Sequence, residues 1–253
     1  MKNIGIFGSC QIYQTSNFFL NNNLLNDNNL NIKFCLPFYE YDEKLMCVYR
    51  GILDYNIFND LDILIIENNN LHNQASSEKI INYCKNQNSK IKIIKTCLLK
   101  FPIYPINWSG YGENKNDYLN WSGLENINYV DKFNKILNNM EKEIINTDLD
   151  NSIVEFIRNN FNKVLLFTHS LHPTNILLYE LWRLILKKLD INIENNNYIF
   201  TNELIICWFN PFTSKMVNDL NINFDCLINE CKINDEFYIS RYKENINNIL
   251  LKN

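Results

Sequence analysis

The sequence predicts an α/β fold in which a parallel sheet is covered by helices on both faces. Through the first hundred residues, short apolar runs alternate with amphipathic stretches, which is the order of strands and helices in such sheets. The apolar runs are nearly unbroken, as in segment 61–66, and strands buried on both faces have this composition. With 253 residues and 46% hydrophobic side chains, the chain can bury a substantial core.

The elements of the first hundred residues follow from these runs. We expect strands at Asn3–Phe7, Asn31–Leu36, Leu61–Ile66 and Lys90–Lys95. We expect helices at Gln11–Leu25, Asp42–Phe58 and Ser76–Cys84, the last with Ser76 or Ser77 as its N-terminal cap. Because the connections are short, the strands are expected to lie parallel in one sheet.

The rest of the chain adds mainly helices. The expected helices are Val130–Ile145, Ser152–Asn160, Thr174–Leu189, a short one from 210–213 to Leu220, and an amphipathic tail over Asn229–Leu251. Strands are expected at Lys163–Phe167 and, once or twice, within Asn197–Trp208. We find no linker, repeat or shift in composition, so we predict a single domain over residues 1–253.

Composition and charge exclude several classes of protein. The formal charge is −4 without a basic block, which argues against a nucleic-acid partner. No run approaches the roughly 18 apolar residues of a membrane span, and a strand begins two residues in, so we expect neither a span nor a signal peptide. Eight cysteines without a C-x-x-C pair favour a reduced, cytoplasmic protein with neither disulfides nor metal. Self-association into a homo-oligomer is compatible with the sequence.

Polar side chains follow three of the expected strands. The segments are Gly8-Ser9-Cys10-Gln11, Glu67-Asn68-Asn69 and Thr168-His169-Ser170-Leu171-His172. Ligands of parallel α/β sheets bind beyond the carboxyl ends of the strands, so these groups are expected to meet at one edge. A thiol at a strand–turn–helix corner lies near helix N–H groups, which favour the thiolate.

Together these groups have the chemistry of acyl transfer. Cys10 would attack, His172 would take the proton, and Asn68 with the backbone N–H groups of Ser9 to Gln11 would hold the oxyanion. His169 is the rival base, and His172 is favoured because Pro173, expected at the first helical position, fixes its backbone. The structural alternatives are that Cys10 is a packed turn residue and that segment 168–175 only caps a helix.

A segment rich in aromatic, proline and glycine residues interrupts the alternation of strands and helices. It runs from about Thr96 to Asn128 and includes Trp108 and Tyr111. A long irregular segment inside a domain is usually functional, and so many aromatic residues argue against disorder. We interpret it as the wall or lid of a binding site, where Trp108 and Tyr111 stack on a ligand; the alternative is packing without a ligand.

These motifs resemble the WcbI-type polysaccharide biosynthesis proteins. Gly8-Ser9-Cys10-Gln11 is similar to their Gly-Asn-Cys-Gln signature, and Trp108-Ser109-Gly110-Tyr111 to their aromatic segment. His172-Pro173-Thr174-Asn175 and Asn210-Pro211-Phe212 match the later parts of the pattern. The resemblance implies an SGNH-type, flavodoxin-like topology, bound coenzyme A, and a reaction centre of Cys10, Gln11 and His172 with Asn175 beside it. This sequence departs from the family signature at position 9, where Ser9 stands in place of the asparagine. His169 stands where SGNH enzymes have an aspartate.

The function that follows is transfer of an acetyl group from acetyl-coenzyme A to a hydroxyl or amino group of a sugar, either a nucleotide sugar or a glycan precursor. The acetyl group either rests on Cys10 as a thioester or passes directly to a sugar deprotonated by His172. Arg50, Lys95 and Lys100 are candidates for the phosphates of coenzyme A by position. Two alternatives stay open, a thioesterase or carbohydrate esterase and a non-catalytic module that binds coenzyme A or sugar.

Overall fold

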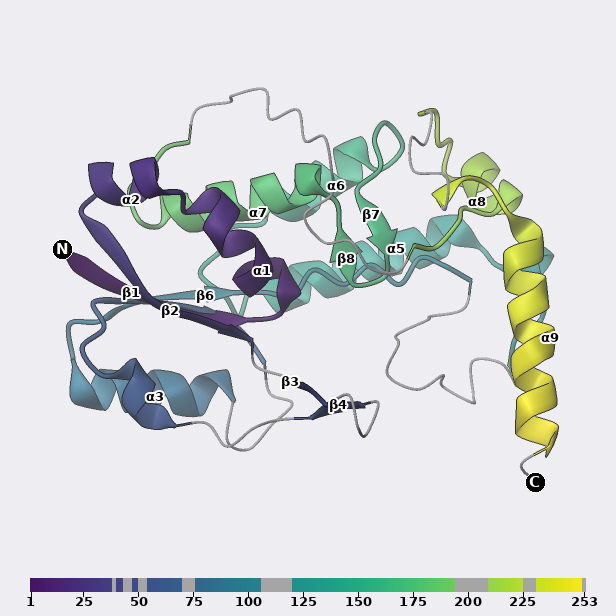
Figure 1. The fold of residues 1–253 in the computed structure, drawn as a ribbon. Coiled ribbons are helices and arrows are strands. Elements are labelled where there is room, and N and C mark those ends of the chain that lie inside the picture. Colours follow the sequence, from purple (N-terminus) through teal and green to yellow (C-terminus); the bar gives the residue numbers. More distant parts are fainter. Residues whose placement is uncertain are drawn as a thin grey trace. The chain divides into compact units, whose positions relative to one another are not determined.

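A computed structural model describes residues 1–37, 40–42, 47–49, 54–69, 76–105, 120–193, 209–224 and 231–251 (Figure 1). Contacts within the chain divide it into two units. Unit 1 consists of Met1–Leu98, Lys142–Ile153 and Leu178–Ile205, and unit 2 consists of Leu99–Glu141, Val154–Leu177 and Ile206–Asn253. The single domain predicted over residues 1–253 stays a prediction.

Unit 1 is built on a four-stranded parallel sheet. Its strands are β1 (Lys2–Gly8), β2 (Leu30–Pro37), β5 (Ile63–Glu67) and β6 (Lys92–Thr96), in the order β2-β1-β5-β6. In register, Ile4 pairs with Ile63 and Ile65 pairs with Ile94. All five residues of β5 are buried, as the apolar run 63–66 predicts for its first four residues. The predicted α/β class with a parallel sheet is therefore confirmed.

Helices cover both faces of this sheet, with α1 (Cys10–Phe19) on one side and α3 (Ser77–Gln87) on the other (Figure 1). Beneath α3, Ile80 joins Phe7, Leu64 and Ile66 in a buried apolar cluster. On the α1 side, the ring of Phe19 stacks on Trp182 with ring centroids 5.8 Å apart. Trp182 lies on α7 (Asn175–Lys187), and the part of α7 from Leu178 onward belongs to unit 1.

A buried hydrogen bond ties α7 to α1. The indole Nε1–H of Trp182 donates to Thr15 Oγ1 over 2.6 Å, and that hydroxyl donates to the carbonyl of Gln11 over 2.6 Å. Trp182 and Thr15 are both fully buried. A buried indole N–H needs an acceptor, and Thr15 supplies it.

Two of the predicted helices are wrong: one is divided into two helices, and the other is absent from the described residues. The helix expected over Gln11–Leu25 is two helices, because α1 ends at Phe19 and Asn21 caps a new helix, α2 (Asn22–Asp27), by accepting from the Leu24 N–H. The helix expected over Asp42–Phe58 is absent in the described part of that range. Strands β3 (Glu40–Asp42) and β4 (Cys47–Tyr49) pair antiparallel there, and the 3₁₀ turn η1 (Tyr55–Phe58) follows.

The physical reasons are local. Val48 and Tyr49 are residues that favour strands over helices, and Asp54 caps η1 by accepting from the Asn56 N–H over 2.9 Å. In contrast, Ser76 caps α3 as predicted, by accepting from the Lys79 N–H.

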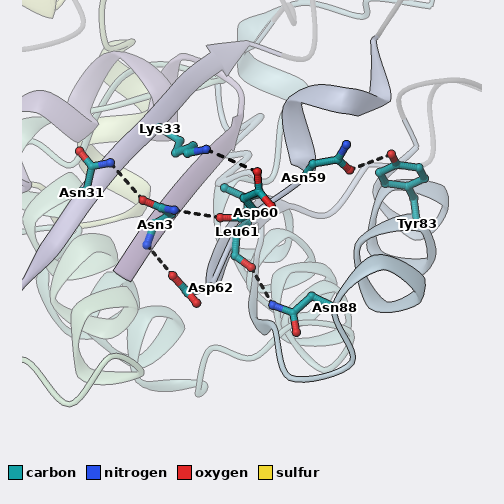
Figure 2. A network of polar contacts seen from close by, with 9 residues as sticks. All are labelled: Asn3, Asn31, Lys33, Asn59, Asp60, Leu61, Asp62, Tyr83 and Asn88. Carbon is teal, nitrogen blue, oxygen red and sulfur yellow. Dashed lines mark hydrogen bonds and ion pairs between the residues drawn. The ribbon is translucent and has the colours of Figure 1, made fainter. Parts of the chain in front are cut away.

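A polar network fastens the starts of the strands in unit 1 (Figure 2). The backbone N–H of Asn3 donates to Asp62 Oδ2 over 2.8 Å, and its side-chain amide donates to the carbonyl of Asp60 over 3.0 Å. Asn31 donates to Asn3 Oδ1 over 3.1 Å, and Asn88 donates to the carbonyl of Leu61 over 3.0 Å. These bonds join β1, β2, the segment before β5 and the segment after α3 at the amino end of the sheet.

Unit 2 contains helices around an aromatic core. Its elements are η2 (Leu124–Asn126), most of α5 (Tyr129–Ile144) and α6 (Ser152–Asn160), α8 (Ser214–Asp219), α9 (Asp235–Leu251) and the hairpin of β7 (Phe167–His169) and β8 (His172–Pro173). The Phe101 ring stacks on Phe167 with centroids 4.6 Å apart, and Tyr104 Oη donates to the Phe167 carbonyl over 2.8 Å. The predicted α5, α6, α8 and helical tail are confirmed to within a few residues.

Two further predictions concern the later strands. The strand expected at Lys163–Phe167 begins later in the structure, where β7 starts at Phe167. The strand expected within Asn197–Trp208 lies outside the described residues. Over the described residues, no helix combines the length and apolar character that crossing a membrane requires.

Candidate active site

The predicted site residues fall in both units. Ser9, Cys10, Gln11 and Asn68 belong to unit 1, whereas the histidines and Asn175 belong to unit 2. The predicted aromatic wall, Trp108 and Tyr111, lies outside the described residues, as does Arg50.

The turn between β1 and α1 places Cys10 at the carboxyl end of the sheet. Ser9 is the N-cap of α1: its Oγ accepts from the Gln11 N–H over 3.3 Å, and its carbonyl accepts from Ile12 and Tyr13. Cys10 is therefore the first residue of the helix, at the end that carries the partial positive charge of the helix dipole. A short buried strand followed by Gly-Ser predicts this arrangement, and the structure contains it.

Cys10 differs from the other described cysteines in its surroundings. Its side chain is partly exposed, whereas Cys84, Cys97 and Cys231 are buried. Burial raises the pKa of the Cys84 thiol to about 11, and burial together with the nearby charges of Glu67 and Glu143 raises that of Cys97 to about 12. Cys35 is also partly exposed, but burial raises its pKa, and its sulfur lies 2.9 Å from Ser16 Oγ.

A buried glutamate supports the turn from the neighbouring strand. Glu67 ends β5 and is 1% exposed; its Oε2 accepts from both the N–H of Ser9 (3.2 Å) and the hydroxyl of Ser9 (2.5 Å). Gly8 makes room for this contact, because a Cβ there would lie 3.2 Å from the Cβ of Glu67 and 3.1 Å from that of Ile12. Glu67 is not among the predicted site residues, although a carboxylate that directly follows the apolar run 63–66 was an available signal.

The hydroxyl of Ser9 thus has two local tasks. It donates its hydrogen to Glu67 and accepts from Gln11, so its geometry is that of a turn-fixing group. Gln11 itself is fully buried beneath the turn.

Asn68 lies at the same edge of the sheet and is half-buried. Its backbone N–H donates to the carbonyl of Thr96 over 2.8 Å, which extends the pairing of β5 with β6. Its Oδ1 accepts from Ser77 over 3.1 Å, so the NH₂ end of the amide is directed away from Ser77. Ser9 follows β1, Glu67 ends β5 and Asn68 comes directly after it. Because β1 and β5 are neighbouring strands, unit 1 brings all three residues to one edge of the sheet.

The histidines lie on a tight hairpin in unit 2. β7 and β8 pair antiparallel with His169 opposite His172, and the two ring centroids are 5.3 Å apart. Both side chains are buried, at 0% and 4% exposure. His169 Nδ1 accepts from the Leu171 N–H over 3.4 Å, which leaves the hydrogen of a neutral ring on Nε2.

This arrangement corrects two expectations. The histidine segment belongs to a two-stranded antiparallel sheet and not to the parallel sheet of β1 and β5. Pro173 is the last residue of β8 and not the first residue of the helix, because α7 begins at Asn175. Thr174 intervenes, and its hydroxyl donates to the carbonyl of Leu165 over 2.8 Å. Asn175, the first helical residue, is 1% exposed.

Two other features of the described residues bear on the site. A hollow of about 480 Å³ in unit 1 is lined by Asn17, Leu20, Asn21, Leu25, Asn31 and Ile32. It lies at the end of α1 opposite to Cys10, so it is not the site of the thiol. No group of three or more His, Cys, Asp or Glu side chains among the described residues is arranged to hold a metal.

The fold is similar to that of a solved structure of WcbI, described as a polysaccharide biosynthesis enzyme, in its native form without a disulfide bond between coenzyme A and a cysteine. The TM-score is 0.63 at 13% identity, over 96% of this chain and 89% of that one. No protein-family model matches this chain, and no curated protein sequence matches it. The likeness shows a shared fold; the predicted WcbI-type family and its SGNH-type topology stay predictions.

Proposed function

We propose that the protein is an acetyltransferase that moves an acetyl group from acetyl-coenzyme A to a hydroxyl or amino group of a sugar in glycan biosynthesis. One observation carries the proposal: the partly exposed thiol of Cys10 stands at the start of α1, beyond the carboxyl end of a parallel strand. Helix N-termini stabilise thiolates and bind anionic groups, and ligands of parallel sheets collect at this edge.

The fold likeness supports the choice of donor. The solved structure of WcbI is described as the native protein without a disulfide bond between coenzyme A and a cysteine, and we infer that this protein also takes coenzyme A. Acetyl-coenzyme A carries its acetyl group on the thiol sulfur of coenzyme A. A reducing compartment such as the cytoplasm keeps the thiols of Cys10 and coenzyme A available, and we place the enzyme there.

In the first of two routes, Cys10 forms a covalent intermediate. Its thiolate attacks the carbonyl carbon of acetyl-coenzyme A, the carbon–sulfur bond to the cofactor breaks, and coenzyme A leaves as a thiolate that takes up a proton. A sugar hydroxyl then attacks the acetyl-cysteine thioester, gives its proton to the imidazole of His172, and releases the Cys10 thiolate.

In the second route, the sugar attacks acetyl-coenzyme A directly. The sugar oxygen or nitrogen bonds to the acetyl carbon and gives its proton to His172, while Cys10 and Gln11 position the thioester. The carbon–sulfur bond then breaks, and coenzyme A leaves as a thiolate that takes up a proton. General base catalysis of this kind contributes about 10²–10⁴ in rate, so both routes depend on His172. His169, with Nδ1 bound to the backbone, is the rival base.

The oxyanion of the tetrahedral intermediate needs hydrogen-bond donors. We assign this role to the NH₂ group of Asn68, which is directed away from Ser77. The backbone N–H groups of Ser9 and Gln11 are bound to Glu67 and to Ser9 Oγ, so they serve to hold the turn. Ser9 contributes by holding the turn in place, because its hydroxyl hydrogen is directed at Glu67. Asn175 and the aromatic residues Trp108 and Tyr111 are proposed to contact the substrates.

The test is acetyl transfer in the presence of a panel of sugars and nucleotide sugars. Incubation with acetyl-coenzyme A should release coenzyme A at a rate that depends on one sugar of the panel, and that sugar should gain the mass of one acetyl group. Fast release of acetate without any sugar would instead identify a thioesterase or esterase. Binding of coenzyme A without either reaction would identify a non-catalytic module.

A further inference from the structure

Two buried polar atoms in and beside the histidine hairpin of unit 2 lack a hydrogen-bond partner among the described residues. They are the hydroxyl of Ser170 and the side-chain Nδ2 of Asn210. The two residues are only 5% and 3% exposed. Buried polar groups are almost always satisfied by protein, water or ligand, so these two atoms require an explanation.

Both residues are fixed to the hairpin by their backbones. The N–H of Asn210 donates to the carbonyl of Thr168 over 2.7 Å. Asn210 therefore lies beside Thr168, the residue of β7 that precedes His169. Ser170 occupies the turn between the two histidines, and its carbonyl accepts from the Phe101 N–H over 2.7 Å. Both residues are therefore held at the hairpin that carries the two imidazoles, whose centroids lie 5.3 Å apart.

The segment that carries Asn210 is anchored on its other side as well. The carbonyl of Pro211 accepts from the buried hydroxyl of Tyr238 over 2.6 Å, and Thr213 caps α8. The backbone of Asn210 is thus fixed on both sides, and its side chain is buried. An apolar side chain would fill the same place without the desolvation penalty of an amide, so packing does not explain the asparagine.

We propose that the amide of Asn210 and the hydroxyl of Ser170 bind oxygen atoms of the sugar that accepts the acetyl group. Amide and hydroxyl groups suit sugar hydroxyls, which both donate and accept hydrogen bonds, and neither residue carries the charge that a phosphate would require. A sugar held there presents a hydroxyl to the imidazole of His172. The identity of this ligand rests on the proposed acetyltransferase function.

The chemical step is unchanged by this assignment. The bound hydroxyl gives its proton to the imidazole and forms a bond to the acetyl carbon, while the sulfur of the thioester leaves. Because Nδ2 of Asn210 and Oγ of Ser170 are shielded from solvent, binding includes an opening of the side chains that cover them.

The experiment compares Asn210→Leu and Ser170→Ala with the wild-type protein. Affinity is measured by calorimetry for glucose, galactose, mannose, N-acetylglucosamine and UDP-glucose at up to 10 mM, and separately for coenzyme A. The dissociation constant of the sugar that binds should rise about tenfold to a hundredfold in each variant, and that of coenzyme A should not change. The midpoint of thermal unfolding should stay the same or rise, because an unsatisfied polar group has been removed.

Asn160→Leu is the matched control in the same unit. The amide of Asn160 donates to the carbonyl of Phe156 over 2.9 Å, so its loss should lower the unfolding midpoint and leave the sugar affinity unchanged. The proposal is overturned if no sugar of the panel binds the wild-type protein, if Asn210→Leu keeps full affinity, or if it loses stability as Asn160→Leu does.

The same variants separate this proposal from the proposed function. If the wild-type enzyme transfers acetyl groups and Asn210→Leu retains its KM for the sugar, the sugar-binding role is wrong and the acetyltransferase stands. If sugar binding depends on Asn210 but no acetyl transfer occurs, the binding role stands and the acetyltransferase is wrong.

Discussion

The hydroxyl of Ser9 donates a 2.5 Å hydrogen bond to the buried carboxylate of Glu67. This bond joins the cap of α1 to the end of the adjacent strand, so the start of the helix and the neighbouring strand hold each other in place. Since Cys10 directly follows Ser9, the position of the thiol depends on this bond and on the second bond from the Ser9 N–H to the same oxygen.

The first prediction concerns the stability that Ser9 provides. Ser9→Ala removes an N-cap and a hydrogen-bond donor to a buried carboxylate, so the free energy of unfolding should fall by about 2–4 kcal/mol. Ser76→Ala is the control, because Ser76 caps α3 without a bond to a buried charge, and it should cost about 1 kcal/mol. Urea denaturation measures both, and equal losses in the two variants would show that the bond to Glu67 contributes nothing.

A second prediction concerns the reactivity of the thiols. Iodoacetamide near pH 8 should modify Cys10 well before Cys84 and Cys97, because those two thiols are buried and their pKa values are raised to about 11 and about 12. Peptide mapping by mass spectrometry after short exposures gives the rates, and the unfolded protein serves as the reference for intrinsic reactivity. Modification of Cys97 as fast as Cys10 would contradict the assignment.

Alkaline pH should destabilise the protein in part through Tyr129. Burial raises its pKa from 10 to about 12, an effect that the hydrogen bond from Thr213 reduces and the charges of Asp235 and Asp219 increase. Its stabilising contribution is complete below pH 10 and is lost as the pH rises from 10 to 12, since the unfolded phenol ionises first. The loss approaches about 1.4 kcal/mol per pH unit.

Tyr129→Phe removes this dependence. Between about pH 10 and pH 11, the unfolding free energy of the variant should therefore fall less steeply than that of the wild-type protein. Urea denaturation at several pH values measures both slopes. Parallel curves would mean that Tyr129 ionises in the folded protein as readily as in the unfolded one.

A fourth prediction tests the link between α1 and α7 within unit 1. Thr15→Val keeps the shape of the side chain but removes the acceptor of the Trp182 N–H, and should lower the free energy of unfolding by about 1–3 kcal/mol. Adding Trp182→Phe to Thr15→Val should cost less than Trp182→Phe alone, because no N–H is then left unsatisfied. Strictly additive losses in this double-mutant cycle would contradict the bond.

The sequence predicts unit 1 well because its signals are local. The apolar run at 61–66 and the Gly-Ser corner at 8–9 each fix a strand end without reference to distant residues. The same reasoning fails over 42–58, where an amphipathic pattern competes with strand-favouring residues and with the Asp54 cap. Pairing with another segment decides such cases, and no local pattern contains that information.

The positions of the predicted site residues followed from the sequence only in part. Ser9 and Cys10 lie where the turn pattern places them, but the role of Glu67 depends on the pairing of β1 with β5, which places its carboxylate beside Ser9. The histidine segment was expected at the edge of a parallel sheet, and a two-residue turn makes it a separate hairpin. The burial of the Asn210 amide could not be identified from sequence, because burial and the lack of a partner among the described residues are properties of the folded chain.

The role of Cys10 is the central claim, and one measurement tests it most directly. Wild-type protein, Cys10→Ala and the control Cys35→Ala are incubated with acetyl-coenzyme A and the sugar panel, and acetylated sugar is quantified by mass spectrometry. We predict transfer by the wild-type protein and by Cys35→Ala, and a loss of at least about a hundredfold in Cys10→Ala with an unchanged unfolding midpoint. Transfer at the wild-type rate by folded Cys10→Ala, or no transfer to any sugar by the wild-type protein, would contradict the account.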